Sequence, residues 1–151
     1  MIKEQPREVR FDGIHCDVLI QQFPCGVVVL KIAGSDVGEF GDAAMQALDN
    51  CLAGSAPVRF FIDARDVRGA SIDVSGEWAK WLGSRKAQFL EVSMLTGSRF
   101  IQITADFVRR FAEMEGLMRI YTEAPAFDDA LAEALGTSGA EGNGGPGPKI
   151  G

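Results

Sequence analysis

The feature that most constrains the fold is an alternation of short β-rich runs with amphipathic helical patterns. The first two runs, residues 16–23 and 26–33, are separated by Pro24-Cys25, which is a hairpin signal. Later runs stand between helical patterns, at residues 58–62, 89–95 and 117–121. Strands that alternate with helices favour a sheet with helices packed against it. We therefore predict an α/β fold, with a mixed sheet of about five strands and about four helices in the order ββαβαβαβα.

Four segments carry apolar residues at helical spacing, and they begin near Phe40, Glu77-Trp78, Phe100 and Phe127. The third is the clearest, because apolar residues recur every one, three or four positions as far as Met114, before a stop at Gly116. The run at 58–62 is apolar throughout, which suits a strand covered on both faces. We expect the last two helices to place four apolar side chains in packed layers: Phe107, Phe111, Phe127 and Leu131.

The chain has 151 residues, of which 46% are hydrophobic, and this length suits a single domain with one core. We assign residues 15–136 to that domain and residues 1–14 to an N-terminal extension. Residues 137–151 are rich in Gly and Pro and have little apolar surface to offset the entropy of ordering. We therefore expect a disordered tail there.

Charge and hydropathy exclude several classes of partner. The net charge is −6 and the pI is near 4.8, so neither nucleic acid nor an anionic membrane is an expected partner. No apolar run approaches the roughly 20 residues that a membrane helix needs. The N-terminus is charged and lacks the apolar core of a signal peptide, so we expect a cytoplasmic protein.

Cysteine and histidine usage argues against a metal centre. Cys16, Cys25 and Cys51 are an odd number without CxxC spacing, which disfavours both disulfides and zinc. His15 is the one histidine, and although Cys16 lies beside it, further ligands would have to come from elsewhere. We predict no metal and no cofactor.

The motifs of common enzyme classes are incomplete. Ser75 lacks the Gly-x-Ser-x-Gly context of a hydrolase, and residues 34–38 lack the Lys of a phosphate-binding loop. Two carboxylate pairs occur, Asp63 with Asp66 and Asp128 with Asp129, but acids are common in loops and in the first turn of helices, where we place the second pair. We predict that the protein is not an enzyme.

A short polar turn, Asp73-Val74-Ser75-Gly76, separates the run at 58–62 from the second helical pattern. A strand, a turn and then a helix place a hydroxyl beside unpaired helix amides, where a phosphate on Ser75 would be favoured. The simpler interpretation is that Asp73 or Ser75 only caps the helix. Trp78 faces either a partner or the core, and the core is the more common place for an aromatic residue at this spacing.

Residues 15–136 resemble the STAS domain family, which comprises the anti-sigma factor antagonists and their relatives. The resemblance rests on the order of the predicted strands and helices and on three motifs. The first is Gly34 after the second strand, and the second is Phe61-Ile62-Asp63 leading into Asp73-Val74-Ser75-Gly76. The third is Gly116-Leu117-Met118-Arg119-Ile120-Tyr121 followed by Phe127-Asp128-Asp129-Ala130-Leu131. It implies a protein-interaction module in which Ser75 accepts phosphate from a partner serine kinase that is also an anti-sigma factor. Asp73 would help present the hydroxyl, and Val74 replaces the usual hydroxylated residue. The implied interaction surface is Asp73, Val74, Gly76 and Trp78.

Two departures favour an alternative function. The connection from Asp63 to Asp73 is longer than is usual in the family, and residues 99–104 extend the third helix. Both features resemble STAS relatives related to lipid-binding Sec14-type domains, many of which lack a phosphorylation switch. The alternative is therefore a module that binds a small molecule or lipid. A switch at Ser75 requires an exposed hydroxyl, whereas the sequence does not specify the partner, the ligand or the oligomeric state.

Overall fold

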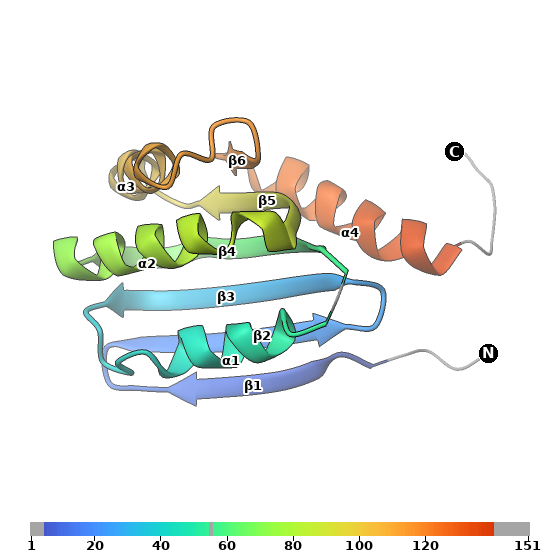
Figure 1. Cartoon of the computed structure of the whole chain (residues 1–151). Coiled ribbons are helices and arrows are strands. Elements are labelled where there is room, and N and C mark those ends of the chain that lie inside the picture. Colours follow the sequence, from blue (N-terminus) through green and yellow to red (C-terminus); the bar gives the residue numbers. More distant parts are fainter. Residues whose placement is uncertain (1–4, 55, 141–151) are drawn as a thin grey trace.

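A computed structural model describes residues 5–54 and 56–140, which form one six-stranded sheet in the order β1-β2-β3-β4-β5-β6 (Figure 1). The first three strands pair antiparallel, and β3 to β6 pair parallel. The strands are β1 (Arg7–Asp12), β2 (Cys16–Phe23), β3 (Val27–Asp36), β4 (Val58–Ala70), β5 (Phe89–Thr96) and β6 (Met118–Tyr121). The predicted mixed α/β fold is confirmed, with one strand more than expected.

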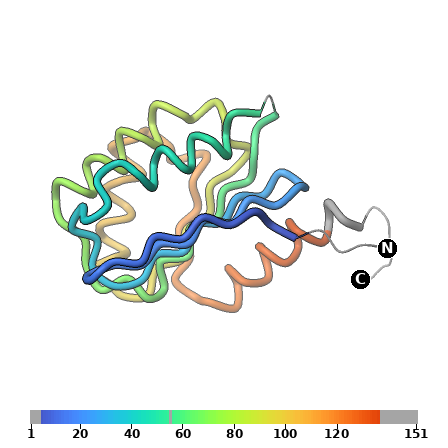
Figure 2. The backbone as a smooth tube through the Cα atoms, turned by 90° about the horizontal axis from the view of Figure 1, so that it is seen from below, coloured from blue at the N-terminus to red at the C-terminus, as the bar shows by residue number. Residues whose placement is uncertain are grey.

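Helices cover both faces of this sheet. Figure 2 shows α1, α2 and α3 on one face and α4 on the other. A short 3-10 turn, η1 (Lys86–Gln88), leads from α2 into β5. The helices are α1 (Ala43–Cys51), α2 (Ile72–Ser84), α3 (Arg99–Phe111) and α4 (Ala124–Ala140). Within the described residues, no helix is both long enough and apolar enough to cross a membrane.

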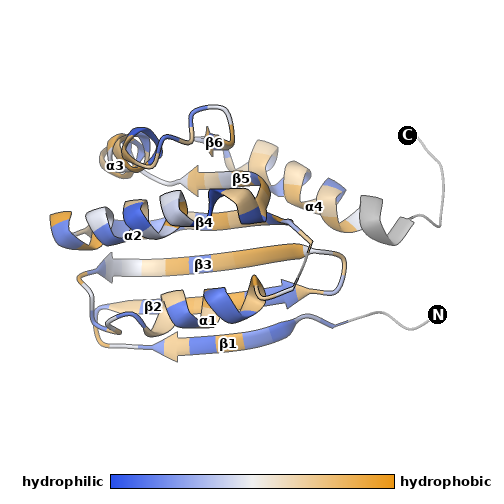
Figure 3. Cartoon of the chain, viewed as in Figure 1, coloured by the Kyte–Doolittle hydropathy of each residue, from blue (hydrophilic) through white to orange (hydrophobic). Residues whose placement is uncertain are grey.

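The central strands supply two cores because successive side chains of a strand point to opposite faces. Phe60 and Ile62 of β4 belong to the larger core under α1, α2 and α3. Phe61, between them, belongs to the smaller core under α4. The prediction that residues 58–62 form a strand covered on both faces is thus confirmed, and the apolar centre of the sheet is visible in Figure 3.

The predicted N-terminal extension contains a strand. β1 pairs with β2 from Arg7↔Gln22 to Asp12↔Asp17 at the edge of the sheet. Its side chains are mostly exposed, so they carry little of the apolar alternation by which a strand is recognised. An edge strand is joined by backbone hydrogen bonds, which are available to any residue except proline.

The residues between the fourth strand and the second helix were predicted incorrectly. β4 continues beyond Ile62 to Ala70, and Asp36 of β3 pairs with Ala70 at its end. As a result α2 begins at Ile72, not at Glu77, and the Asp73-Val74-Ser75-Gly76 segment lies inside the helix. The polar turn expected before the helix is the first part of the helix itself.

The last helix also differs from expectation. α4 begins at Ala124, so Asp128 and Asp129 lie beyond its first turn. The start of the predicted tail, up to Ala140, is helical, and the rest of that tail, residues 141–151, lies outside the described residues.

The helical stripe on α3 is only partly in the core. Phe107 and Phe111 are about half exposed, so their predicted place in the packed layers is wrong. α3 ends at Phe111, before the predicted stop at Gly116. The residues that α3 buries are Ile101, Ala105 and Val108. On α4 the prediction is confirmed, because Phe127 is fully buried and Leu131 is half-buried against the same core.

Candidate functional site: an apolar pocket between the sheet and helices α2 and α3

Ser71, not Asp73 or Ser75, caps α2. The Ser71 backbone is extended, and its Oγ accepts a hydrogen bond from the Val74 backbone N–H at 3.1 Å. Ser75, one turn further on, donates its hydroxyl hydrogen to the Ser71 carbonyl oxygen at 3.0 Å. Ser75 is 7% exposed, so its hydroxyl lacks the accessibility that a switch at this position requires. Phosphorylation of Ser75 stays a prediction, and it would require the first turn of α2 to open.

Three of the four residues of the predicted interaction surface line one open groove, and the fourth does not. Asp73, Val74 and Trp78 line an open groove of about 540 Å³ between the starts of α1 and α2. Gly76 borders open space. Trp78 is half-buried, packs against the larger core and donates its Nε1 hydrogen to Asp36 Oδ2 at 3.1 Å. Trp78 is therefore held against the domain by its packing and its hydrogen bond, and its role in an interaction surface stays a prediction.

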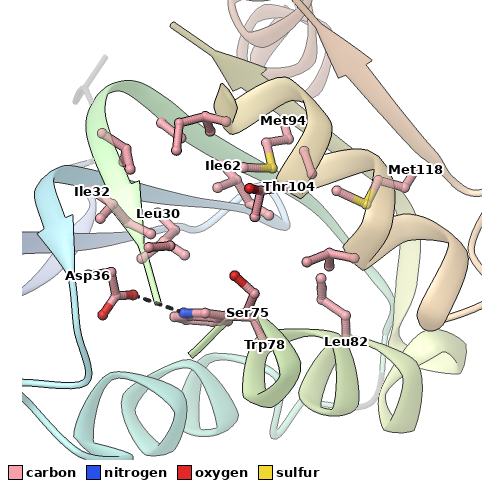
Figure 4. Close-up of a pocket in the computed structure, with 16 residues that line it drawn as sticks. Leu30, Ile32, Asp36, Ile62, Ser75, Trp78, Leu82, Met94, Thr104 and Met118 are labelled. Atoms are coloured by element: carbon pink, nitrogen blue, oxygen red, sulfur yellow. Dashed lines mark hydrogen bonds between the residues drawn. The ribbon is translucent and has the colours of Figure 1, made fainter. Parts of the chain in front are cut away.

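Behind Trp78 lies an apolar pocket of about 80 Å³. Its floor is the sheet, and its walls are the inner faces of α2 and α3 (Figure 4). Ser75 and Trp78 come from α2, whereas Thr104 comes from α3. The apolar side chains labelled around it are Leu30, Ile32, Ile62, Leu82, Met94 and Met118.

Every polar side chain that lines this pocket is already hydrogen-bonded within the protein. Asp36 accepts from Trp78 Nε1 and, at 3.2 Å, from the Gly38 backbone N–H. Thr104 Oγ1 donates to the Phe100 carbonyl oxygen at 3.1 Å, and Ser75 donates to Ser71. Because these groups already have partners within the protein and the other lining side chains are apolar, the pocket offers mainly dispersion contacts and hydrophobic burial.

Small side chains on the facing elements create this space. Ala64, Ser75 and Ala105 line the pocket at positions where a larger side chain would fill it. At the other end of the helices Gly83 lies so close to α3 that an added Cβ would be 3.5 Å from Ala112. α2 and α3 are therefore in contact near their C-terminal ends, while the pocket extends along the two helices from Ser75 and Ile101 to Leu82 and Val108. It lies near the carboxyl ends of the parallel strands. Open α/β sheets often bind ligands at this end.

Sequence reasoning missed the pocket because no single motif encodes it. One signal was present: Val74, Trp78, Trp81 and Leu82 continue the helical stripe back into the segment interpreted as a turn. Extending the helix backwards would have placed Ser75 on its inner face. The partners on β5 and α3 could not be identified, since their proximity depends on packing.

The other residues considered for chemistry have structural roles or no common site. Asp63 and Asp128 both pair with Arg65, at 3.0 and 2.6 Å, and so connect β4 to α4. Asp66 and Asp129 are exposed. Within residues 5–54 and 56–140, no group of three or more His, Cys, Asp or Glu side chains is placed to hold a metal ion.

Cys16 lies beside the exposed His15 but is itself buried. Burial, with smaller contributions from Asp36, Glu39 and Asp17, raises the pKa of its thiol to about 11. A thiol with so high a pKa is a poor nucleophile and a poor metal ligand at neutral pH.

Comparison with known proteins supports the fold. No protein-family model matches the chain, and no curated protein matches it. A solved structure from Shewanella loihica PV-4, described as an uncharacterized protein of the DUF3478 family with a SpoIIAA-like fold, aligns with a TM-score of 0.57. The two chains are 17% identical, and the alignment covers 80% of this chain and 98% of the other. The likeness shows that this chain has a SpoIIAA-like fold, which is the fold of the STAS domains.

Proposed function

We propose that this protein is a STAS-like module that binds a small apolar molecule, or the apolar end of an amphiphile, between the sheet and helices α2 and α3. The observation that carries the proposal is the pocket behind Trp78, whose polar wall groups are all bonded within the protein. A closed core normally leaves few voids larger than a water molecule. An apolar space of this kind is favourable for a hydrocarbon and unfavourable for water.

The size of the pocket limits the occupant. An engineered apolar cavity of roughly 150 Å³ accepts benzene. At about 80 Å³ this pocket fits a group of a few carbons without rearrangement, so only the terminal carbons of a longer alkyl chain enter it unless the pocket widens. Met94 and Met118 line it, and their unbranched side chains adapt easily to a larger occupant. We therefore expect affinity to depend on the alkyl group and only weakly on the polar end.

Methyl NMR with 1-octanol as the probe tests this proposal. Octanol should shift the methyl resonances of Met94 and Met118, which line the pocket. The methyl of Met114 should shift less, because Met114 is buried in the same core but does not line the pocket. Octanoic acid, which has the same alkyl chain length with a charged end, should bind with similar affinity.

A filling variant gives the matched comparison. Ala105→Leu places extra carbons in the pocket and should weaken octanol binding by at least about tenfold. Ala132→Leu, an exposed position on α4 across the sheet, should bind octanol normally. Both variants should melt cooperatively. Equal affinities for the two variants, or no shift at Met94 and Met118, would overturn the proposal.

The fold itself favours a second candidate, the protein-interaction module implied by the resemblance to anti-sigma factor antagonists. Here Ser75 would be phosphorylated by a serine kinase of anti-sigma type, with Asp73, Val74, Gly76 and Trp78 at the interface. Burial of Ser75 argues against it, since a phosphate enclosed among apolar side chains is costly. The intact mass of protein isolated from its own cells, measured with and without phosphatase treatment, tests this candidate. A phosphate that is present on the unmodified chain and absent from Ser75→Ala would favour it.

A further inference from the structure

An apolar stripe runs along the outer side of α3. Its four side chains are between 48% and 60% exposed although all are large and apolar: Phe100, Ile103, Phe107 and Phe111. The rings of Phe107 and Phe111 stack at 5.8 Å, so this part of the stripe is already ordered. Residues at intervals of three and four along a helix form a continuous seam, which is the pattern that pairs helices.

From this stripe we infer that two copies of the chain associate through α3, with the two helices antiparallel about a two-fold axis. The inference is independent of the pocket, because the pocket lies against the other side of α3, at Ile101, Ala105 and Val108. A two-fold interface requires a surface that is complementary to itself. The stripe meets that requirement in both its apolar residues and its charges.

The apolar residues are arranged symmetrically about the middle of the helix. With the axis near Ala105 and Asp106, Phe100 of one copy lies near Phe111 of the second copy. Ile103 then lies near Phe107 of the second copy. Each large side chain of the stripe thus meets another, whereas a shift of register by one turn would leave an aromatic ring in water at each end.

The charges at the ends of the stripe are complementary in the same register. Arg99 precedes Phe100, Glu113 follows Phe111, and both are exposed. In the described part of the chain neither side chain has an ion-pair partner, whereas Asp106 pairs with Arg109 and Arg110 at 2.7 and 2.9 Å. The antiparallel arrangement brings Arg99 of each copy towards Glu113 of the other. Pairs at a rim of this kind contribute mainly to orientation and specificity.

A second copy fits this surface better than an anionic membrane does. Both basic and acidic side chains flank the stripe, namely Arg99, Arg109, Arg110, Asp106 and Glu113, and the whole chain carries a net charge of −6. This mixed surface on an acidic chain is not the cluster of basic residues that an anionic lipid surface attracts, whereas a second copy supplies a partner to both Arg99 and Glu113. Four side chains per copy make a small interface, so we expect a reversible monomer–dimer equilibrium that depends on concentration.

Sedimentation velocity over a range of protein concentrations tests the pairing. The unmodified chain should shift from monomer to dimer as its concentration rises. Phe107→Ser should raise the dissociation constant by at least about tenfold, because an aromatic anchor at the centre is lost. Ile72→Ser removes an apolar side chain from α2 that is even more exposed, at 88% against 48% for Phe107, and should leave the dimer unchanged.

Charge exchange tests the antiparallel register. Arg99→Glu alone places two acidic side chains at each end of the dimer, and Glu113→Arg alone places two basic ones there. Each variant should therefore dimerise more weakly than the unmodified chain. A mixture of the two single variants should form a heterodimer, because both of its ends are then complementary, and the double variant should regain self-association.

Three outcomes would overturn the inference. One is a chain that stays monomeric at every concentration, and another is a dimer that Phe107→Ser leaves intact. The third is sedimentation of the monomer with phosphatidylserine vesicles that is lost in Phe107→Ser, which would assign the stripe to a lipid surface. In all experiments thermal melting should show that the variants fold, as expected for exposed positions.

Discussion

At the scale of single residues, two serines at the start of α2 have different roles that could not be distinguished from the sequence. Ser71 satisfies an unpaired amide at the helix end, whereas Ser75 makes its bond to a carbonyl one turn back. The Ser71 hydroxyl accepts from the Val74 backbone N–H, which has no carbonyl partner within the helix. The bond from the Ser75 hydroxyl is additional, because the Ser71 carbonyl already accepts from the Ser75 backbone N–H at 3.0 Å.

Substitution of the two serines should therefore have unequal effects. Ser71→Ala should lower the free energy of unfolding by about 1 kcal/mol, which is the usual cost of losing a helix cap. Ser75→Ala should cost less, since the lost hydroxyl leaves no unpaired group and its methyl group faces an apolar pocket. Urea denaturation measures both, and a greater loss for Ser75→Ala would contradict this assignment.

Glu39 provides a pH-dependent contact at the turn between β1 and β2. Its carboxylate accepts the backbone N–H groups of Ile14 and His15 at 2.6 and 3.0 Å. Partial loss of water raises the pKa of Glu39, but these hydrogen bonds outweigh it and hold the pKa below its usual value of 4.5. A carboxylate with a depressed pKa stabilises the fold at pH values above 4.5, and this stabilisation is lost as the pH falls through the folded-state pKa.

We expect Glu39→Gln to melt at a lower temperature than the unmodified chain at neutral pH. The difference should be constant above pH 4.5 and should shrink on further acidification, because the unmodified carboxylate then becomes protonated. Melting curves of both proteins between about pH 3 and pH 7 measure it. A difference that grows on acidification would contradict the assigned contact.

At the scale of elements, α3 and α4 show that helices of similar pattern can be buried to different extents. Phe127 of α4 is 0% exposed and packs edge-on against Phe61 and Tyr121, each at 5.8 Å between ring centres. Phe111 of α3 instead stacks on its own helix, next to solvent. The same residue type therefore contributes to the core in one helix and to the surface in the other.

A pair of truncations measures this difference. Phe127→Ala should cost about 3–5 kcal/mol, since it removes buried surface and leaves a cavity. Phe111→Ala should cost below about 1 kcal/mol in the monomer, because little surface is lost from the core. Denaturant melts at low protein concentration, where the monomer prevails, make the comparison. Equal losses would show that Phe111 is packed in the folded chain.

At the scale of the whole molecule, the sheet is protected at its centre and open at its edges. β3 and β4 are covered by helices on both faces, as Figure 2 shows, and contribute to both cores. β1, at one edge, exposes most of its side chains, and β6, at the other, has four residues. Local opening should therefore start at the edges.

Hydrogen exchange measures this order. The amides of Val28, Leu30, Phe60 and Ile62 should exchange most slowly, at rates near those of global unfolding. The amides of β1 that bond to β2 should exchange earlier, although they form a full ladder from Arg7 to Asp12. Equal protection of β1 and β4 would show that the sheet opens as a single unit.

The sequence by itself determined the α/β class, the order of the elements after β1 and the double burial of residues 58–62. Those features are readable because the spacing of apolar residues directly records which faces of a strand or helix are covered. β1 escaped recognition since its pairing uses backbone groups, which every residue carries.

Only the tertiary structure decided where α2 begins and what lies beneath it. β4 continues to Ala70 because β3 pairs with it that far, which delays the turn and places Ser75 inside the helix. The pocket exists because small side chains from three elements meet between the sheet and helices α2 and α3. The exposure of Phe107 and Phe111 depends on how far the neighbouring elements extend around α3. These outcomes depend on contacts between residues far apart in the chain, which local periodicity does not record.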